Sequence, residues 1–239
     1  MRVRVSCAVL AGLLLAGAAS ASAPPAGRFV SHVQTIERRV ALTFDDGPNP
    51  AYADSLLSEL ASRHIHATFF VVGEEAAWHP EVIAKLVAAG HEVENHTWSH
   101  PQLDTVSAVR IRWELAKCDT LLDSLGVKLS RVMRPPYGVT AGALQGVLRR
   151  THRAGVLWDV DPDDDPYPVA SIHDELHTLL SQVHPGAIVL LHPWYDDNVV
   201  TRAALPALLD SLSLRGYHVG TLTELSHARR ARWKDWVPW

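Results

Sequence analysis

Cysteine is scarce in this chain of 239 residues, and its scarcity excludes a fold held together by disulfides. Of the two cysteines, Cys7 lies in an N-terminal apolar segment that we expect to be removed, which leaves Cys118 alone. Cys118 falls within a helical pattern of apolar residues, which predicts a small buried hydrophobic side chain. The folded protein must therefore draw its stability from its core. With 47% hydrophobic residues, the chain is long enough for one sizeable core.

Long apolar runs are missing beyond the N-terminus. Arg2 and Arg4 precede an apolar run over residues 5–19, and Ala19-Ser20-Ala21 is a small-residue pattern typical of a cleavage site. The run is too short to cross a bilayer comfortably. We therefore predict a Sec-type signal peptide over residues 1–21 and a periplasmic or extracellular protein with no membrane span in its mature chain.

An excess of positive charge is missing as well. The chain has 22 Lys and Arg against 26 Asp and Glu, a formal charge of −4, and losing Arg2 and Arg4 gives 20 − 26 = −6. Nucleic-acid-binding domains usually carry a basic surface. We therefore expect no nucleic-acid partner. The sequence leaves the oligomeric state open.

Strand and helix patterns alternate about seven times between residues 39 and 225. The expected strands cover 40–44, 67–72, 91–95, the region from about 131, 155–160, 187–191 and 217–222. Helical patterns lie between them, for example over 106–125 and 172–183. Such alternation is typical of an α/β fold with a parallel sheet, either an open doubly wound sheet or a closed barrel. We assign residues 22–38 to a linker and 226–239 to a basic, Trp-rich tail that we expect to pack back on the domain.

Polar clusters directly follow five of the expected strands. They are Asp45-Asp46, His96 to His100, Arg134 to Tyr137, the acidic run 161–165, and His192. In α/β folds the C-terminal ends of parallel strands share one face, where active sites are built. We therefore expect the five clusters to converge on one site.

Two of these clusters carry the side chains of a metal site. His96 and His100 are four residues apart, and on a helical turn they would lie on one face, about 5–6 Å apart at Cβ. With Asp46 as an oxygen ligand, the set becomes two imidazoles and one carboxylate, which leaves open positions and so indicates a catalytic site. Zn²⁺ is the first expectation, while Mn²⁺, Co²⁺, Ni²⁺ and Fe²⁺ are compatible with the same ligands.

The remaining clusters supply the groups that hydrolysis needs. Asp45 is the candidate general base, and Arg134 could hold it ionised by pairing with it. A backbone N–H in the turn 136–138 could stabilise an oxyanion. His192 could protonate the leaving group, and an acidic residue at 161 or 163–165 would favour its imidazolium form.

The sequence resembles the polysaccharide deacetylases, which carry the NodB homology domain and form carbohydrate esterase family four. Four motifs match in order: Thr43 to Pro48, His96 to His100, Arg134 to Tyr137, and Leu190 to His192. The resemblance covers about residues 39 to 225. It implies a single-domain, distorted (β/α) barrel of about seven parallel strands. It also implies hydrolysis of N-acetyl groups, or sometimes O-acetyl groups, on a polysaccharide.

The resemblance also implies a role for each matching residue. It makes Asp46, His96 and His100 the ligands of a divalent metal, usually zinc. It makes Asp45 the base, His192 the acid and the Tyr137 backbone the oxyanion donor.

One motif departs from the family pattern. The family often has Asp-x-x-Asp-Trp before its last motif, whereas this chain has Asp161-Pro162-Asp163-Asp164-Asp165. Asp164 aligns with the carboxylate that partners the acid His, but Asp165 replaces the Trp. Either Trp158 or Trp194 could supply the missing aromatic wall, or the site could be more open. For Asn95, Trp98, Trp194 and Tyr195, we favour packing over substrate contact.

Two other functions stay open at this point. The chain could be a related C–N hydrolase acting on a non-sugar amide, which the signal peptide argues against. It could also be a non-catalytic glycan-binding relative, although such a protein would usually have lost base, ligands or acid. The residues do not distinguish peptidoglycan, chitin oligomers, acetylated xylan or an exopolysaccharide as substrate.

Overall fold

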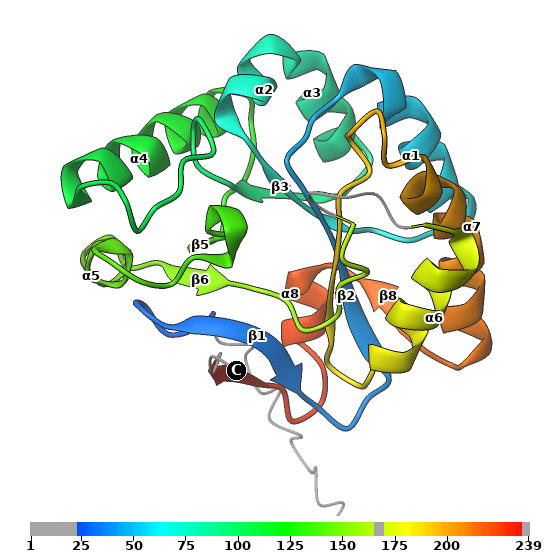
Figure 1. The fold of residues 1–239 in the computed structure, drawn as a ribbon. Helices are drawn as coiled ribbons and strands as arrows, with labels where there is room; N and C mark the ends of the chain where they lie inside the picture. Colours follow the sequence, from blue (N-terminus) through cyan, green and yellow to red (C-terminus); the bar gives the residue numbers. More distant parts are fainter. Residues whose placement is uncertain (1–22, 165–169, 236–239) are drawn as a thin grey trace, which may run out of the picture.

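A computed structural model describes residues 23–164 and 170–235 of the chain (Figure 1). The predicted signal peptide and Asp165 lie outside these residues. The strands are β1 (Phe29–Gln34), β2 (Arg39–Asp45), β3 (Thr68–Val71), β4 (Glu92–Asn95), β5 (Val132–Met133), β6 (Ala154–Val156), β7 (Ile188–Leu191), β8 (His218–Gly220) and β9 (Arg232–Asp235). The helices are α1 (Pro50–Ser62), α2 (Gly73–Trp78), α3 (Pro80–Ala88), α4 (Ala108–Ser124), α5 (Leu144–Arg150), α6 (Ile172–Gln182), α7 (Val199–Leu214) and α8 (Leu222–Ser226), and η1 (Pro136–Gly138) is a 3-10 turn.

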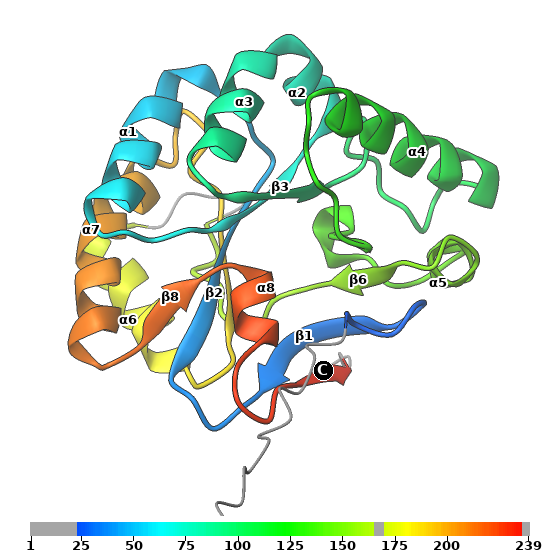
Figure 2. The same ribbon diagram turned by 180° about the vertical axis from the view of Figure 1, so that it is seen from behind.

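The strands form one curled sheet in the order β7-β2-β3-β4-β5-β6-β1-β9, and β8 pairs with the first half of β2 on the side opposite β7. Every pairing among β1 to β8 is parallel, and β9 alone runs antiparallel to its neighbour among the described strands. Helices lie along the outside of the curl, while α8 lies at one end of it, next to β1 and β8 (Figures 1 and 2). The distorted (β/α) barrel expected from the sequence is confirmed.

The two edges of the curl meet through irregular contacts. The segment after β6 leaves β1 and joins β7, where Val160 pairs with Val189. Below it, Val33 N–H donates to the Gly186 carbonyl at 2.9 Å, and His32 pairs with Ala187. The barrel is therefore closed by isolated bridges rather than by a continuous ladder, which explains its distorted shape.

Burial on both faces accounts for the strand sequences. Phe44, Leu42 and Val40 on β2 face the layer between sheet and helices, and Ala41 faces the barrel interior. The interior also holds Phe70 and other apolar side chains. A strand covered on both sides is nearly continuously apolar, as expected for a parallel sheet. The carboxylate of Asp45, the last residue of β2, marks the end of the strand and the start of the site.

Local signals in the sequence account for where the helices begin and end. Asn49 caps α1 by accepting a hydrogen bond from Ala51 N–H at 3.0 Å, and Pro50 takes the first helical position. Gly90 and Gly126 follow α3 and α4 with φ of 81° and 79°, the left-handed conformation in which glycine ends helices. The short helix α2 is absent from the sequence-based prediction.

The predicted linker over 22–38 is wrong. Residues 29–34 form β1, whose Phe29, Val30 and Val33 are buried and which pairs with β6. The strand looks like a linker because polar residues interrupt its apolar ones.

The domain boundary at 225 is also too early. Residues 232–235 of the tail form β9, which pairs with β1. The expectation that the tail packs back on the domain is thereby confirmed for this part. The described strands of the sheet therefore extend from residue 29 to residue 235.

Two further expectations concern the core and the membrane. Cys118 is fully buried on α4 and is the free cysteine of the described chain. Burial raises the pKa of its thiol far above its usual value, so that it stays neutral and acts as a small apolar side chain. Within the described residues, no helix combines the length and the apolar character that crossing a bilayer requires.

Candidate active site

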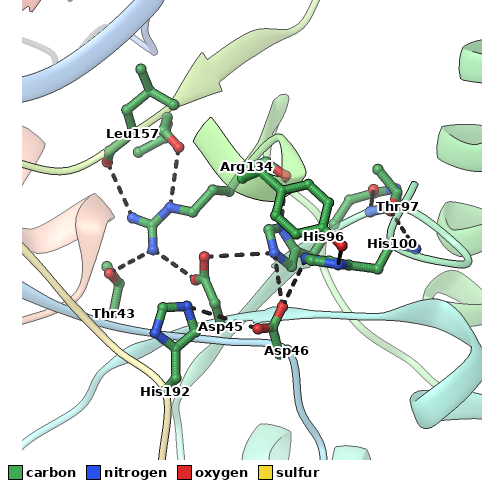
Figure 3. Close-up of polar contacts among 12 residues, drawn as sticks. Thr43, Asp45, Asp46, His96, Thr97, His100, Arg134, Leu157 and His192 are labelled. Carbon is green, nitrogen blue, oxygen red and sulfur yellow. Dashed lines mark hydrogen bonds and ion pairs between the residues drawn. The ribbon is translucent and has the colours of Figure 1, made fainter. Parts of the chain in front are cut away.

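The predicted site residues come together at the C-terminal ends of the strands (Figure 3). Asp45 is the last residue of β2, and His96 directly follows β4. Arg134 follows β5, and His192 follows β7. The convergence expected from the order of the strands is therefore observed.

Three side chains of the kinds that ligate metals form a compact group: Asp46, His96 and His100. Asp46 Oδ1 lies 3.1 Å from His96 Nε2 and 3.0 Å from His100 Nε2, and the three atoms lie within 4.8 Å of one another. The side chain of Asp46 is 6% exposed. This buried Oδ1 accepts no well-directed hydrogen bond from the described residues.

The protonation of His96 makes that group suitable for a cation. His96 Nδ1 lies 2.7 Å from the Arg134 carbonyl, which can only accept, so Nδ1 carries the hydrogen. In the neutral ring, Nε2 then presents a lone pair to a carboxylate oxygen. Lone pairs that converge repel unless a cation lies between them, and a second hydrogen bond that orients a ligating imidazole is usual in metal sites. The residues therefore fit a divalent metal.

Charges act strongly on this group. Burial raises the pKa of Asp46, but the imidazoles of His100 and His96 outweigh burial and hold the pKa well below its usual range. Burial lowers the pKa of His96, but Asp45 and Asp46 together raise it. Asp46 is therefore held as an anion, the form in which a carboxylate binds a metal.

The backbone of the site is unusual. Asp46, Thr97, His100 and Tyr137 have φ of 73°, 71°, 53° and 59°, in the left-handed region that side chains other than glycine rarely adopt. They account for four of the eight non-glycine residues with positive φ among the described residues. Strained backbone of this kind concentrates at functional sites.

The helical turn predicted for 96–100 is wrong. These residues form a loop, and the left-handed conformations of Thr97 and His100 bring the two imidazoles to a centroid separation of 4.9 Å. Asn95 Oδ1 accepts from Thr97 N–H at 2.8 Å, and Thr97 Oγ1 accepts from His100 N–H at 3.1 Å. Side-chain hydrogen bonds, rather than helical ones, therefore fix the spacing of the pair.

Glu114 on α4 supports this loop, and the sequence analysis missed it. Its Oε2 accepts from the N–H groups of Trp98 and Ser99, both at 2.9 Å, and it is fully buried. A signal was available, because Glu114 interrupts the buried stripe of Ile111, Leu115 and Cys118. A carboxylate on an apolar helix face needs donors from the surrounding structure.

Asp45 and Arg134 form the predicted ion pair. Arg134 Nη1 donates to Asp45 Oδ1 at 2.7 Å, and both side chains are buried. The guanidinium also donates to Thr43 Oγ1 at 2.8 Å and to the carbonyls of Val156 and Leu157, both at 3.2 Å (Figure 3). Asp45 Oδ2 remains directed at the centre, 3.6 Å from His96 Nε2.

His192 pairs with Asp164, as the aligned motif predicts. His192 Nδ1 donates to Asp164 Oδ1 at 2.8 Å, and the His192 N–H donates to Oδ2 at 2.9 Å. Burial lowers the pKa of His192, but the hydrogen bond and the charge of Asp164 outweigh it and raise the pKa to about 9. Nε2 faces the centre, 3.8 Å from Asp46 Oδ2.

A second buried carboxylate stands behind Asp164. Thr201 Oγ1 lies 3.1 Å from Asp164 Oδ2 and 3.2 Å from Glu175 Oε2, and all three residues are buried. Burial, followed by repulsion from Asp164, raises the pKa of Glu175 to about 7. Sequence reasoning missed Thr201 and Glu175, although Glu175 is a charged residue on the buried face of α6 with Leu179.

The aromatic residues divide into packing and site residues. Trp194 is 4% exposed and lies so close to Gly47 that a Cβ there would be 2.4 Å from its ring, so it packs rather than forming an open wall. Trp158 is half-buried against Gly138, with its ring centroid 5.6 Å from the Arg134 guanidinium carbon. Trp158 is therefore the aromatic side chain that borders the site next to Arg134.

Of the other three residues assigned to packing, Asn95 is confirmed, because it is fully buried. Trp98 is half-buried and donates its indole N–H to Glu74 at 2.8 Å, so its packing role stays a prediction. The assignment is wrong for Tyr195, which is 38% exposed and donates its hydroxyl to Asp46 Oδ2 at 2.7 Å. The Tyr137 hydroxyl lies 3.2 Å from His100 Nδ1, so its side chain as well as its backbone borders the site.

Fold and site together define an α/β-barrel protein of hydrolase type, with a centre that could hold a metal at the strand ends. Comparison with known proteins gives the family. Residues 32–156 match the family model described as polysaccharide deacetylase. A chitooligosaccharide deacetylase from Bradyrhizobium sp. (strain ANU 289) is 36% identical over 200 residues, which span 79% of this chain and 90% of that protein. The chain belongs to the polysaccharide deacetylase family, as its motifs predicted.

Solved structures agree with this assignment. The Bc1960 peptidoglycan N-acetylglucosamine deacetylase matches with a TM-score of 0.77 at 28% identity, covering 84% of this chain and 94% of that one. BA3943 from Bacillus anthracis, described as a CE4 family pseudoenzyme, matches with a TM-score of 0.76 at 28% identity, covering 83% of this chain and 68% of that one. The family therefore includes a protein of this fold that is described as a pseudoenzyme.

Proposed function

We propose that this chain is an exported hydrolase that removes N-acetyl groups, or O-acetyl groups, from a cell-wall or extracellular polysaccharide. Its cofactor is a divalent metal, with Zn²⁺ the first candidate, held by Asp46, His96 and His100. One observation carries the proposal: base, ligand group and acid are all present and meet in one site. The relatives that are named deacetylases of chitooligosaccharide and peptidoglycan support the substrate class.

The metal would act as a Lewis acid that polarises the acetyl carbonyl and lowers the pKa of water. Asp45 accepts the proton of the attacking water through Oδ2, because Oδ1 is occupied by Arg134. Arg134 keeps Asp45 ionised and fixes its rotamer, which a general base requires. The water oxygen forms a bond to the acetyl carbon, and the carbonyl becomes an oxyanion.

The remaining residues complete the reaction. The Tyr137 N–H, in the middle of a strained turn, stabilises the oxyanion. When the intermediate collapses, the C–N bond breaks and His192 gives its Nε2 proton to the leaving amine. Acetate and the free amino sugar are the products. Asp164 holds His192 in its protonated form until that step.

The complete set of groups also bears on the alternatives. A non-catalytic relative would have no use for the buried Asp45–Arg134 pair or for the His192–Asp164 pair, both of which cost desolvation free energy. A hydrolase of a non-sugar amide would need the same groups, so substrate tests must distinguish it.

Acetate release is the direct test. The purified chain is incubated with peptidoglycan, chitin oligomers, acetylated xylan and an acetylated exopolysaccharide, with and without added Zn²⁺. We expect metal-dependent acetate release from at least one of the four. No release from any of them, together with hydrolysis of a non-sugar amide, would favour the second function.

A further inference from the structure

A second cavity, of about 160 Å³, lies at the end of the barrel opposite the site, next to α8 (Figure 2). At this end α8 contacts the first residues of two strands. Leu222 N–H donates to the hydroxyl of Thr68 on β3 at 3.0 Å, and Thr223 N–H donates to Glu92 on β4 at 3.2 Å. A cavity of about 150 Å³ can hold a molecule the size of benzene. This cavity is therefore large enough for a small organic ligand.

Apolar side chains form much of the wall of this cavity. Val132, Val156 and Leu222 line it and belong to the apolar interior of the barrel, and Trp233 on β9 packs against that interior. The exposed residues Thr223 and His227 also line the cavity, so it is accessible from solvent. Burying the apolar part of a ligand against such a wall is favourable.

The carboxyl group of Glu94 is incompletely paired in this wall. Glu94 lines the cavity from β4 and is 3% exposed. Its Oε1 accepts from Ser130 N–H at 3.0 Å, whereas its buried Oε2 accepts no hydrogen bond from the described residues. Buried polar atoms are almost always paired, so an orphaned carboxyl oxygen beside a cavity indicates a missing hydrogen-bond donor. A ligand in the cavity can supply that donor.

The charges around the cavity favour a cation as that donor. Glu92 and Glu94 both line it, whereas no lysine or arginine of the described residues does. Arg153 acts on Glu94 from outside the cavity, but its guanidinium is paired with Asp119. The imidazole that lines the cavity, that of His227, is exposed. Burial raises the pKa of Glu94 to about 8, and a cation placed beside its carboxyl group would lower that pKa again and displace the proton.

We propose that this cavity binds a primary ammonium group on a short apolar stem, with Glu94 as its carboxylate partner and the apolar wall around the stem. On binding, Glu94 gives its proton to solvent, and the ammonium donates to Oε2 in a charge-assisted hydrogen bond. Two sources carry this chemistry. One is a free alkylamine. The other is the α-amino group that the predicted cleavage after Ala21 would create, because Ala23 and Pro24 line the cavity.

The test measures the binding of n-butylammonium and of n-butanol, its uncharged counterpart of the same size, to the chain 22–239 by calorimetry. We expect n-butylammonium to bind at least about tenfold more tightly at pH 8, because it alone forms an ion pair. Its affinity should rise from pH 6 to pH 8 as more Glu94 ionises, and binding should release a proton to the buffer. Glu94→Gln can still accept from Ser130 N–H but should lose the preference for the ammonium. Glu75→Gln, at a partly buried carboxylate outside the cavity, is the matched control and should keep it.

Repeating the measurement on the chain with its α-amino group acetylated separates the two sources. Equal binding of n-butylammonium to both forms identifies a free amine as the ligand, and binding to the acetylated form alone identifies the chain's own amino group. Equal affinities for n-butylammonium and n-butanol, binding to neither form, or an unchanged preference in Glu94→Gln would overturn the ammonium site. Acetate release depends on the other end of the barrel, so it tests the proposed function independently.

Discussion

At the scale of single residues, the backbone of Asp46 determines the geometry of the centre. A residue that simply continued β2 would point away from the side on which Asp45 lies. With φ of 73°, Asp46 instead turns its carboxylate to the same site as Asp45. Asp45 meets Arg134, and Asp46 meets His96 and His100. Two adjacent carboxylates thus acquire different partners and different tasks.

Replacing Asp45 by Asn tests the division of tasks. The amide oxygen can still accept from Arg134, so the fold and the Asp46 group should persist, but an amide cannot take up a proton. We expect kcat to fall about 10²- to 10⁴-fold with metal content unchanged. Turnover near the wild-type rate with normal metal content would show that Asp45 is not the base.

Replacing Asp164 by Asn tests the pairing with His192. The carboxylate raises the pKa of His192, so its loss should lower that pKa. In the proposed mechanism His192 acts in its protonated form, so activity is present below its pKa and is lost as the pH rises through it. The alkaline limb of the pH–rate profile should therefore move to lower pH. Asp163→Asn is the control, since Asp163 is exposed and should leave the limb in place. An unmoved limb in Asp164→Asn would contradict the pairing.

At the scale of elements, α6 and α7 form a buried support for the acid. A hydroxyl has one hydrogen, so Thr201 can donate to Asp164 or to Glu175 but not to both. The raised pKa of Glu175, about 7, allows its carboxyl group to keep its own hydrogen near neutrality and donate it to Thr201. Thr201 can then donate to Asp164, which in turn accepts from His192.

This chain of hydrogen bonds predicts losses of different size for two substitutions of Thr201. Thr201→Val removes the shared hydroxyl, which takes one hydrogen bond from Asp164 and the partner of Glu175 Oε2, and this should cost about 1–3 kcal/mol of unfolding free energy. Thr201→Ser keeps the hydroxyl and should lose less. Urea denaturation measures both, and equal midpoints for Val and Ser would mean that the hydroxyl contributes nothing.

The strands differ in how well the sequence predicts them. The central strands were predictable because buried parallel strands are continuously apolar, and strand order then predicted the convergence of the site. The strands β1 and β9 could not be predicted in this way, since their pairing joins residues about 200 positions apart and β9 is a charged edge strand. The loop at 96–100 was misassigned because its shape depends on Glu114 and Asn95, which no local spacing encodes.

At the scale of the whole molecule, a buried acid lies at the other end of the barrel. Glu94 is 3% exposed, its Oε1 accepts from Ser130 N–H at 3.0 Å, and its Oε2 accepts no hydrogen bond within the described chain. It borders a cavity of about 160 Å³. Burial raises its pKa from 4.5 to about 8. The folded state thus resists its ionisation.

The direction in which stability changes with pH follows from the number of protons that the folded and the unfolded states bind. Between pH 4.5 and 8 the folded protein holds the Glu94 proton and the unfolded chain does not, so this group lowers stability as the pH rises. Glu94→Gln cannot ionise. We expect the stability of the variant relative to wild type to rise with pH over this window, by at most about 1.4 kcal/mol per pH unit. A pH-independent difference in denaturation free energy would contradict the buried neutral state.

The central claim is that deacetylation depends on one divalent metal held by Asp46, His96 and His100. Two remaining ligands hold such an ion poorly, so His96→Ala should lose both metal and activity. The control His177→Ala removes one of a second pair of histidines at i and i+4, His173 and His177 on α6, and should change neither.

The decisive measurement is metal content by mass spectrometry alongside acetate release, before chelation, after it and after reconstitution. We predict one metal per chain in wild type and His177→Ala, none in His96→Ala, loss of acetate release on chelation, and recovery with the metal. Acetate release that survives complete removal of the metal would contradict the account.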